Sequence, residues 1–410
     1  MNRVVVTGMG AITPVGNNVQ TMWDNLVAGR HGIGTITRFD VEGYKSTLAA
    51  EVKDFDPLEY MEKSEARRLD LYSQYAIAAV TQAVNDSGIQ GNVDPERFSI
   101  CVGSGVGGIN TFESEHGKLV AGGARKVSPL FIPMMISNLG AGNLAIRFNA
   151  RGSCTCVVTA CATGADAIGA AYREIKHGYT DAAIAGGAEA AISPMGVSGF
   201  MNMTALTTSS DPDAASLPFD SRRAGFVIGE GAGALILEEY EHAKRRGAKI
   251  YAEVTGYSAT CDAHHITAPD PGGQSAARAL SNAFRESGSP EGIIYVNAHG
   301  TGTLLNDATE TNALKLAFGS NIGNLLVSST KSMTGHMLGA AGAVEAIISI
   351  MTLNEGIIPP TVGLFEPDPE CDLDYIPLKA RNVRPKLAMT VSLGFGGHNA
   401  CVAFAKEGEK

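Results

Sequence analysis

The sequence predicts an α/β protein made of two similar lobes, each a layered sheet with helices on its faces. Its 410 residues, 44% of them hydrophobic, exceed the needs of one ordinary core and suffice for two. Short apolar runs rich in β-branched residues alternate with stretches of helical period, which is typical of sheets covered by helices. The order of these segments restarts near residue 250. We therefore expect an N-terminal lobe over residues 1–250 and a C-terminal lobe over residues 251–410.

The N-terminal lobe begins with an expected strand at residues 4–7, which a turn at Gly8 and Gly10 ends. Residues 11–13 supply no third glycine, so this is a structural turn and not a dinucleotide fingerprint. An amphipathic helix is expected over residues 64–86. Further strands are expected at 98–102, 155–159, 181–186 and 232–237, and further helices at 133–148, 165–177 and 239–246. The polar segment after the strand at 98–102 is expected to be an insertion.

The C-terminal lobe repeats this order of elements with little residue identity. Strands are expected at 250–256, 293–297, 327–329, 387–393 and 401–404, and helices at 274–287, 307–318 and 338–353. Because only the order is shared, internal duplication is an inference from topology.

Composition excludes several classes of function. The net charge of -10 argues against a general nucleic-acid surface, and no apolar run approaches transmembrane length. The first residues form a strand and lack the pattern of a signal peptide. Seven scattered cysteines are typical of free thiols in a reducing cytosol, so we expect a cytoplasmic protein. Cys154 and Cys156 are the only tight pair and lack two further ligands, so no metal site is predicted.

Cys161 is the first candidate for chemistry. An apolar β-branched run ends at this thiol, and a helix of small residues follows it. A helix N-terminus offers unpaired N–H groups and the positive end of the helix dipole, which favour a thiolate over a thiol. Taken alone, the same cysteine fits core packing equally well.

Three other strands run into loops of small and polar residues, around His299, around His336 and around Phe395. Loops at strand ends are where α/β enzymes carry reactive groups. A cysteine and two histidines on separate loops suit a thiol enzyme that stabilises developing negative charge. Separately, each has a structural explanation: a hydrogen-bonded core histidine, a helix cap, a solvated Lys331 or a plain glycine turn.

Four motifs together resemble the signature set of the β-ketoacyl-[acyl carrier protein] synthases, and most closely the elongating synthase II type of dissociated bacterial fatty acid synthesis. The motifs are Thr-Ala-Cys at 159–161, Asn-Ala-His-Gly-Thr at 297–301, Ser-Thr-Lys-Ser-Met-Thr-Gly-His at 329–336 and Gly-Phe-Gly-Gly at 394–397. The resemblance runs in order from residue 4 to residue 404. Four long motifs in register are far more specific than any single cysteine or histidine.

The resemblance implies the thiolase fold, in which two similar lobes with five-stranded mixed sheets form five alternating αβαβα layers, usually as a homodimer. It implies that Cys161 takes the acyl chain from a carrier thioester and that His299 and His336 serve the malonyl group. It assigns the backbone N–H groups of Cys161 and Phe395 to the oxyanion of the acyl transfer. The Phe395 ring would act as a gate, which flanking glycines allow to swing.

Physical chemistry suits these implied roles. Acyl transfer between two thioesters is nearly balanced, so a thiol can load and release the chain. Decarboxylation of malonyl leaves an enolate, which two neutral imidazole N–H donors would stabilise, whereas a cationic histidine would protonate the carbanion. Lys331 resembles the active-site lysine of the family and would give electrostatic support, with Glu345 as its partner.

Substrate-binding residues follow from the same resemblance. Thr301 and Thr303 match the hydroxyls that bind a phosphopantetheine arm. Val106 and Phe200 fall at positions that line the acyl tunnel in relatives, although core packing explains apolar residues equally well.

The substrate would arrive on acyl carrier protein, whose recognition helix is acidic in this family, and no organic cofactor would be needed. A local basic patch is therefore expected despite the negative net charge. The candidate docking residues are Lys63, Arg67, Arg68, Arg125 and Lys126. Ordinary solvated charges are the alternative.

The sequence thus predicts a carrier-dependent condensing enzyme that extends an acyl chain by two carbons in fatty acid biosynthesis. A polyketide ketosynthase would share its catalytic residues. A thiolase or chain-initiating synthase would use a second cysteine or an asparagine where this chain has His336 and His398-Asn399. A non-catalytic subunit that binds carrier or sets chain length would usually lack the nucleophile, which Cys161 supplies.

Overall fold

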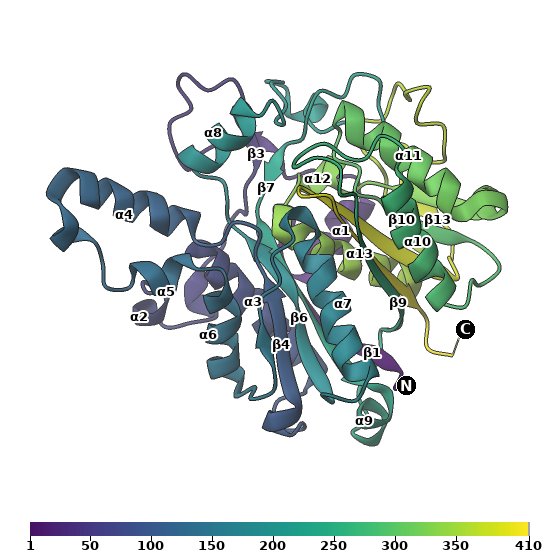
Figure 1. The fold of residues 1–410 in the computed structure, drawn as a ribbon, viewed down its shortest axis with the longest axis horizontal. Helices are drawn as coiled ribbons and strands as arrows, with labels where there is room; N and C mark the ends of the chain where they lie inside the picture. The colour runs from purple at the N-terminus through teal and green to yellow at the C-terminus, as the bar shows by residue number, and fades with distance from the viewer. Residues whose placement is uncertain (409–410) are drawn as a thin grey trace.

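The computed structural model describes residues 1–408 and contains two halves of identical strand topology, drawn from purple to teal and from green to yellow in Figure 1. The five sheet strands of the first half are β1 (Val4–Ile12), β4 (Phe98–Gly103), β5 (Cys154–Thr155), β6 (Ala182–Glu189) and β8 (Gly231–Glu239). Those of the second half are β9 (Ala252–Cys261), β10 (Ile294–Asn297), β11 (Leu325–Ser328), β14 (Leu387–Gly394) and β15 (His398–Ala405).

Both halves are mixed sheets with the same order and directions. The first runs β5-β4-β6-β8-β1 and the second β11-β10-β14-β15-β9, so that the strands of each half, counted along the chain, appear as third, second, fourth, fifth, first. In each half the first three in this list are parallel, and the remaining pairings are antiparallel. The order of elements that restarts near residue 250 in the sequence is therefore seen in the structure as a second sheet of the same topology.

The two sheets are joined edge to edge by β1 and β9. Val4 pairs with Val254, Val5 with Glu253 and Val6 with Ala252, all antiparallel. The ten strands therefore form one continuous hydrogen-bonded sheet.

Helices complete five layers. The central layer is α7 (Thr163–Lys176) and α13 (Ala341–Glu355), which contact each other and strands of both halves. Helices α3 (Leu71–Ser87) and α6 (Asn138–Phe148) cover the outer face of the first sheet. Helices α10 (Gln274–Glu286) and α11 (Leu304–Phe318) lie on the second half, with α10 against β9 and β15. This αβαβα arrangement is the thiolase fold that the motifs predict.

Helix α13 is the core helix of the molecule. The expectation that no apolar run approaches transmembrane length is wrong: among the described helices, the segment Leu338–Glu355, which is α13 with the turn before it, is long and apolar enough to cross a membrane, but 89% of that window is buried inside the protein. The apolar length is thus explained by the two sheets that enclose the helix.

Some predicted elements differ in the structure. The turn predicted at Gly8 and Gly10 is wrong, since both residues lie within β1. Glycine is needed at these positions because a Cβ on Gly8 would lie 2.2 Å from Ala83 O, and a Cβ on Gly10 would lie 2.0 Å from Ala79 O, both in α3. The glycines therefore let α3 pack closely on the strand.

The helix predicted over residues 64–86 is broken. A short α2 (Lys63–Ala66) precedes α3, which starts after Asp70, an extended residue whose carboxylate accepts from the N–H of Tyr72 at 3.3 Å. The helix predicted at 133–148 likewise divides into α5 (Phe131–Met135) and α6 around the extended Ile136. Of the strand predicted at 155–159, only Thr155 is paired, in β5.

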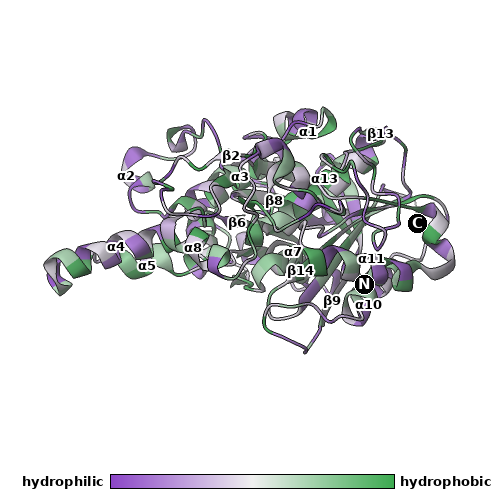
Figure 2. Ribbon diagram, turned by 90° about the horizontal axis from the view of Figure 1, so that it is seen from above, coloured by the Kyte–Doolittle hydropathy of each residue, from purple (hydrophilic) through white to green (hydrophobic). Residues whose placement is uncertain are grey.

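The remaining elements frame the site or the surface. They are α1 (Val19–Val27), α4 (Ile109–Gly122), α8 (Pro194–Asn202), α9 (Tyr240–Arg245), α12 (Lys331–Thr334), β2 (Gly34–Thr35), β3 (Leu48–Ala50), β7 (Ile228–Gly229), β12 (Ile357–Ile358) and β13 (Arg381–Asn382). Helix α4, which the sequence presents as a polar insertion, projects from the body at the left of Figures 1 and 2, where green hydrophobic segments are mixed with purple ones.

Candidate active site

The predicted reactive residues of both halves line one cavity of about 950 Å³. Its walls include Cys161 from the first half and His299, His336 and Phe395 from the second. The two halves meet here because the central helices begin at this end of the sheets. The structure therefore brings together the residues of all four motifs.

Cys161 lies in a strained elbow before α7. It is the middle residue of the 3-10 turn Ala160–Ala162, and Ala160 before it has a φ of 51°, a left-handed conformation that costs energy for a residue with a side chain. The hydroxyl of Thr163 accepts from the N–H of Thr159 at 2.9 Å and closes the elbow. The backbone thus presents the thiol at the start of the helix.

The thiol of Cys161 is buried, with 7% of the residue exposed. Burial, helped by the Glu189 carboxylate, raises its pKa to about 12, although the Lys331 charge and the N–H groups of Phe395 and Cys161 act in the opposite direction. The expectation that the helix N-terminus holds a resting thiolate is therefore wrong for the unliganded protein. Desolvation outweighs the helix terminus.

His299 and His336 face each other at the other side of the cavity. Their rings meet edge to face, with centroids 5.2 Å apart, and the Nδ1 atom of each is buried without a hydrogen-bond partner. Burial and the nearby charge of Lys331 hold the pKa of both rings well below the ordinary value. Both are therefore neutral at pH 7, as stabilisation of an enolate requires.

His299 is held by a carboxylate that the sequence analysis missed. Glu310 on α11 accepts from the backbone N–H of His299 and of Gly300, each at 2.7 Å, and burial raises its pKa to about 7. The available signal was a pair of acidic residues, Asp307 and Glu310, one turn apart on the helix that follows the His299 motif.

His336 is held by backbone pairing to the segment around β7. Its N–H donates to Val227 O at 2.8 Å, and the N–H of Gly229 donates to its carbonyl at 2.9 Å. The ring of Phe226 meets the imidazole edge to face with centroids 5.2 Å apart. These contacts fix the ring from outside the cavity.

Lys331 and Glu345 form a buried ion pair between α12 and α13, with side chains only 1% and 2% exposed. Burial raises the pKa of Glu345, and the Lys331 charge acts against that rise. The structure thus places the predicted partner beside the predicted lysine. The ammonium lies close enough to lower the pKa of both histidines.

The Phe395 loop is the three-residue turn between β14 and β15, in which Gly394 pairs with His398. Gly396 and Gly397 have φ values of 87° and 75°, which favour glycine. A Cβ on Gly394 would lie 2.7 Å from Thr159 O and 3.2 Å from Cys161 N, so the strand end can approach the elbow only without a side chain.

Phe395 and Phe200 line the same cavity, with ring centroids 6.4 Å apart. Val106 is 40% exposed and is not among the described residues that line it. The single chain therefore brings Phe200 to the site but not Val106.

Thr301 and Thr303 lie at the cavity wall with their hydroxyl oxygens 3.0 Å apart. A residue that the sequence analysis missed, Arg223, donates to the carbonyl of Thr303 at 3.2 Å and to that of Leu304 at 3.1 Å. This buried guanidinium fixes the loop that carries the two hydroxyls. No motif around Arg223 signals this role.

The predicted docking residues are exposed and lie outside the cavity. Lys63 begins α2, Arg67 and Arg68 follow it, and Arg125 and Lys126 lie in the 3-10 turn Ala124–Lys126 after α4. Helices α2 and α4 are at the same end of the molecule in Figures 1 and 2.

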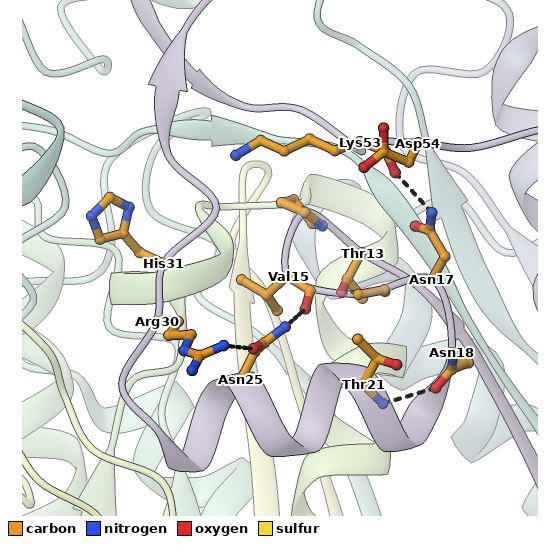
Figure 3. A pocket seen from close by; sticks show the side chains of 12 residues that line it. Thr13, Val15, Asn17, Asn18, Thr21, Asn25, Arg30, His31, Lys53 and Asp54 are labelled. Carbon is orange, nitrogen blue, oxygen red and sulfur yellow. Dashed lines mark hydrogen bonds between the residues drawn. The ribbon is translucent and has the colours of Figure 1, made fainter.

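A second hollow of about 480 Å³ lies around the start of α1 (Figure 3). Arg30, His31 and Lys53 line it; Arg30 donates to Asn25 at 3.3 Å and His31 contacts Asp213 at 2.8 Å. It contains none of the predicted site residues. Within residues 1–408, no group of three or more His, Cys, Asp or Glu side chains is arranged to hold a metal ion.

Comparison with known proteins gives the same picture over the whole chain. Models of the β-ketoacyl synthase N-terminal and C-terminal domains match residues 1–243 and 251–365. The 3-oxoacyl-[acyl-carrier-protein] synthase 2 of Synechocystis sp. is 49% identical over 407 residues, and that of Staphylococcus aureus is 47% identical over 406; each alignment covers 98% of both chains.

Solved structures agree. A β-ketoacyl synthase from Burkholderia phymatum superposes with a TM-score of 0.91 at 34% identity, over 99% of this chain and 100% of that one. A type II polyketide ketosynthase, solved in complex with its acyl-carrier protein, superposes with a TM-score of 0.92 at 32% identity, over 99% of both chains.

Proposed function

This chain belongs to the β-ketoacyl synthase family, and from that premise we propose that Cys161, His299 and His336 carry out a decarboxylative condensation of acyl and malonyl groups. The chain is an acyltransferase of the 3-oxoacyl-[acyl-carrier-protein] synthase II type, which acts in fatty acid biosynthesis. One observation supports the residue roles most strongly: a thiol from one half faces two neutral imidazoles from the other in a single cavity.

The first step is acyl transfer to Cys161. The sulfur attacks the carrier thioester, the new C–S bond replaces the bond to the pantetheine sulfur, and the proton lost by Cys161 is balanced by the one that the departing thiol takes up. The N–H groups of Cys161 and Phe395 act on this sulfur and favour its charged form. We assign them to the oxyanion of the tetrahedral intermediate.

The second step is decarboxylation of malonyl. The C–C bond to the carboxylate breaks, CO₂ leaves, and the electron pair forms an enolate on the thioester. His299 and His336 stabilise its oxygen as neutral donors, because protonated rings would quench the carbanion. Lys331 serves this step by keeping both rings neutral through its charge.

In the third step the enolate carbon attacks the acyl group on Cys161. The C–C bond forms, the C–S bond breaks, and the Cys161 thiolate that leaves takes up one proton from solvent, which the overall reaction consumes. The product is a 3-oxoacyl thioester two carbons longer. Phe395, on a glycine turn beside the thiol, is placed to close the cavity between steps.

Acyl carrier protein is the partner of the enzyme. Thr301 and Thr303 are assigned to the phosphopantetheine arm, which belongs to the substrate, so the reaction needs no cofactor of the enzyme's own. The exposed cations Lys63, Arg67 and Arg68 are assigned to the acidic carrier, together with Arg125 and Lys126.

We also infer a cytoplasmic homodimer. The arm that carries α4 and α5 exposes large apolar side chains, and the edge strand β5 is exposed and has one unpaired side. The exposed apolar residues of this region are Phe112, Leu119, Val120, Ile132 and Val158. Equilibrium sedimentation should give twice the monomer mass, and a Val120→Asp, Ile132→Asp variant should be monomeric.

The polyketide alternative is not favoured, because the fatty acid relatives are 47–49% identical and the polyketide ketosynthase is 32% identical. A condensation assay with malonyl-carrier and acyl-carriers of different chain length tests the proposal. The wild type should form 3-oxoacyl products with an acyl-Cys161 intermediate visible by mass spectrometry. Cys161→Gln should abolish condensation and keep malonyl decarboxylation; acylation of another cysteine would overturn the assignment.

A further inference from the structure

Glu189 is a buried carboxylate at the end of β6 that the reaction scheme above does not use. It is fully buried and accepts four hydrogen bonds. The donors are Ser104 Oγ at 2.9 Å, Gly105 N at 2.8 Å, Val106 N at 3.1 Å and Gly339 N at 3.0 Å. These donors come from two segments that are far apart in the sequence.

The first segment is the loop after β4. Ser104 donates to Glu189 and at the same time accepts from Gly107 N at 3.0 Å, so one carboxylate orders the whole turn. The second segment is the 3-10 turn Leu338–Ala340, which starts two residues after His336. Glu189 therefore links a strand of the first half to the turn beside a histidine of the second.

The two segments meet so closely that positions 105 and 339 can be occupied only by glycine. A Cβ on Gly339 would lie 2.5 Å from Gly105 N and 2.8 Å from the carboxylate, and a Cβ on Gly105 would lie 2.8 Å from the same oxygen. Leu338 has a φ of 47°, a left-handed conformation that surrounding contacts must maintain. The hydrogen bond from Gly339 to Glu189 is one such contact.

Burial raises the pKa of Glu189, whereas the four hydrogen bonds lower it and suit an ionised carboxylate. Three of the four donors are backbone N–H groups, which cannot accept a proton from a neutral acid, and the fourth hydroxyl is already engaged with Gly107. The charge is also felt at the nucleophile, where Glu189 raises the pKa of Cys161. Glu189 thus acts on both sides of the site without lining the cavity.

We propose that Glu189 is a positioning residue, which fixes His336 relative to Cys161 by clamping the turn after His336 to the loop after β4. This inference rests on the proposed roles of His336 and Cys161. The carboxylate holds His336, one of the two enolate donors, in place, and its charge slows the loss of the Cys161 proton. It does not touch substrate.

Glu189→Gln separates the two effects. An amide offers one acceptor oxygen where the carboxylate offers two, and its NH₂ faces N–H groups, so the turn after His336 loses its anchor. Decarboxylation of malonyl-carrier should fall roughly 10- to 100-fold, the size of effect that a small misplacement produces. Alkylation of Cys161 by iodoacetamide should become faster at pH 8, because the neighbouring negative charge is gone.

Glu189→Asp should lower decarboxylation without shifting the alkylation profile, since the charge remains while the reach shortens. Glu238→Gln is the matched control: Glu238 is also fully buried and accepts from Thr7 and Arg246, away from the cavity. This variant should be less stable than the wild type but should keep the wild-type rates of malonyl-carrier decarboxylation and of Cys161 alkylation. If Glu189→Gln fails to fold, Ser104→Ala takes its place and should lower decarboxylation severalfold.

The proposal is overturned if Glu189→Gln decarboxylates within about twofold of the wild type. It is also overturned if alkylation and decarboxylation fall together in proportion to a lost melting temperature, as for a purely structural residue. A wild-type enzyme that alkylates at Cys161 but does not condense would instead contradict the proposed function, so the two failures are distinguishable.

Discussion

The rings of His299 and His336 meet edge to face with centroids 5.2 Å apart, although the two residues are 37 positions apart in the sequence. Each is enclosed by protein and each lies within reach of the Lys331 charge, which together keep both neutral. The two histidines are therefore preorganised hydrogen-bond donors and do not act as general acids.

Decarboxylation should tolerate mild acid. Because the pKa of both histidines lies well below 6.5, the rate should stay level as the pH falls through that value, where an ordinary histidine gains its proton. Lys331→Met removes a charge that lowers these pKa values, so its rate should begin to fall at a higher pH than the wild type's. The check is a pH–rate profile of malonyl-carrier decarboxylation. A wild-type midpoint near 6.5 would contradict the assignment of neutral rings.

Cys161 should rest as a protonated thiol and react through its small thiolate fraction. Because the pKa of Cys161 is about 12, the rate constant for its alkylation should rise about tenfold per pH unit from pH 7 to 9 and reach no plateau in this range. Iodoacetamide labelling followed by mass spectrometry measures this rate. Cys261, which is exposed and lies outside β5, is the internal control. A plateau below pH 8 would show that the pKa of Cys161 is low and that the helix N-terminus stabilises the thiolate more than burial disfavours it.

The Lys331–Glu345 pair should be costly to break and much less costly to replace. Lys331→Met alone leaves a buried carboxylate and should lower the free energy of unfolding by about 3–5 kcal/mol. The double variant Lys331→Met, Glu345→Met should recover most of that loss in urea unfolding, while condensation stays impaired. Equal stability of the single and double variants would argue against a coupled buried pair.

Carrier docking should depend on the exposed cations. Arg67→Glu with Arg68→Glu should raise KM for acyl-carrier about tenfold or more and weaken its dependence on salt, because rim charges act mainly on encounter. Turnover of a short pantetheine thioester, which needs no carrier, should be unchanged. Arg245→Glu, on exposed α9, is the matched control. Equal effects of both changes would remove the docking assignment.

Much of the site was visible in the sequence because its motifs are contiguous. Each of Cys161, His299, His336 and Phe395 follows a strand in its own short segment, and the repeated order of strands predicts that such segments converge. Glu189 could not be found in this way, because its donors belong to loops that are far away in the sequence and leave no pattern around Glu189 itself. Glu310 lies close to His299 in the sequence, and its only signal was the acidic pair that it forms with Asp307.

The wrong element predictions have tertiary causes. Gly8 and Gly10 look like a turn, yet a strand needs them so that α3 can approach its backbone. The division between α2 and α3 depends on Asp70, whose carboxylate also binds Thr111 of α4 at 2.7 Å. A thiolate was expected at Cys161 from the helix N-terminus alone, but burial raises the pKa of this thiol, and burial is a tertiary property that the local sequence does not show.

The strand pairing between β1 and β9 has a consequence for how substrate enters. Two-lobed enzymes often open by rotation about a hinge, but here the lobes share hydrogen bonds from Val4 to Val6 and enclose α7 and α13 between them. Separating the lobes would break the hydrogen bonds between β1 and β9 and expose the apolar core around α7 and α13. Access and water exclusion therefore fall to a few residues at the rim, and the scaffold stays a fixed frame through the catalytic cycle.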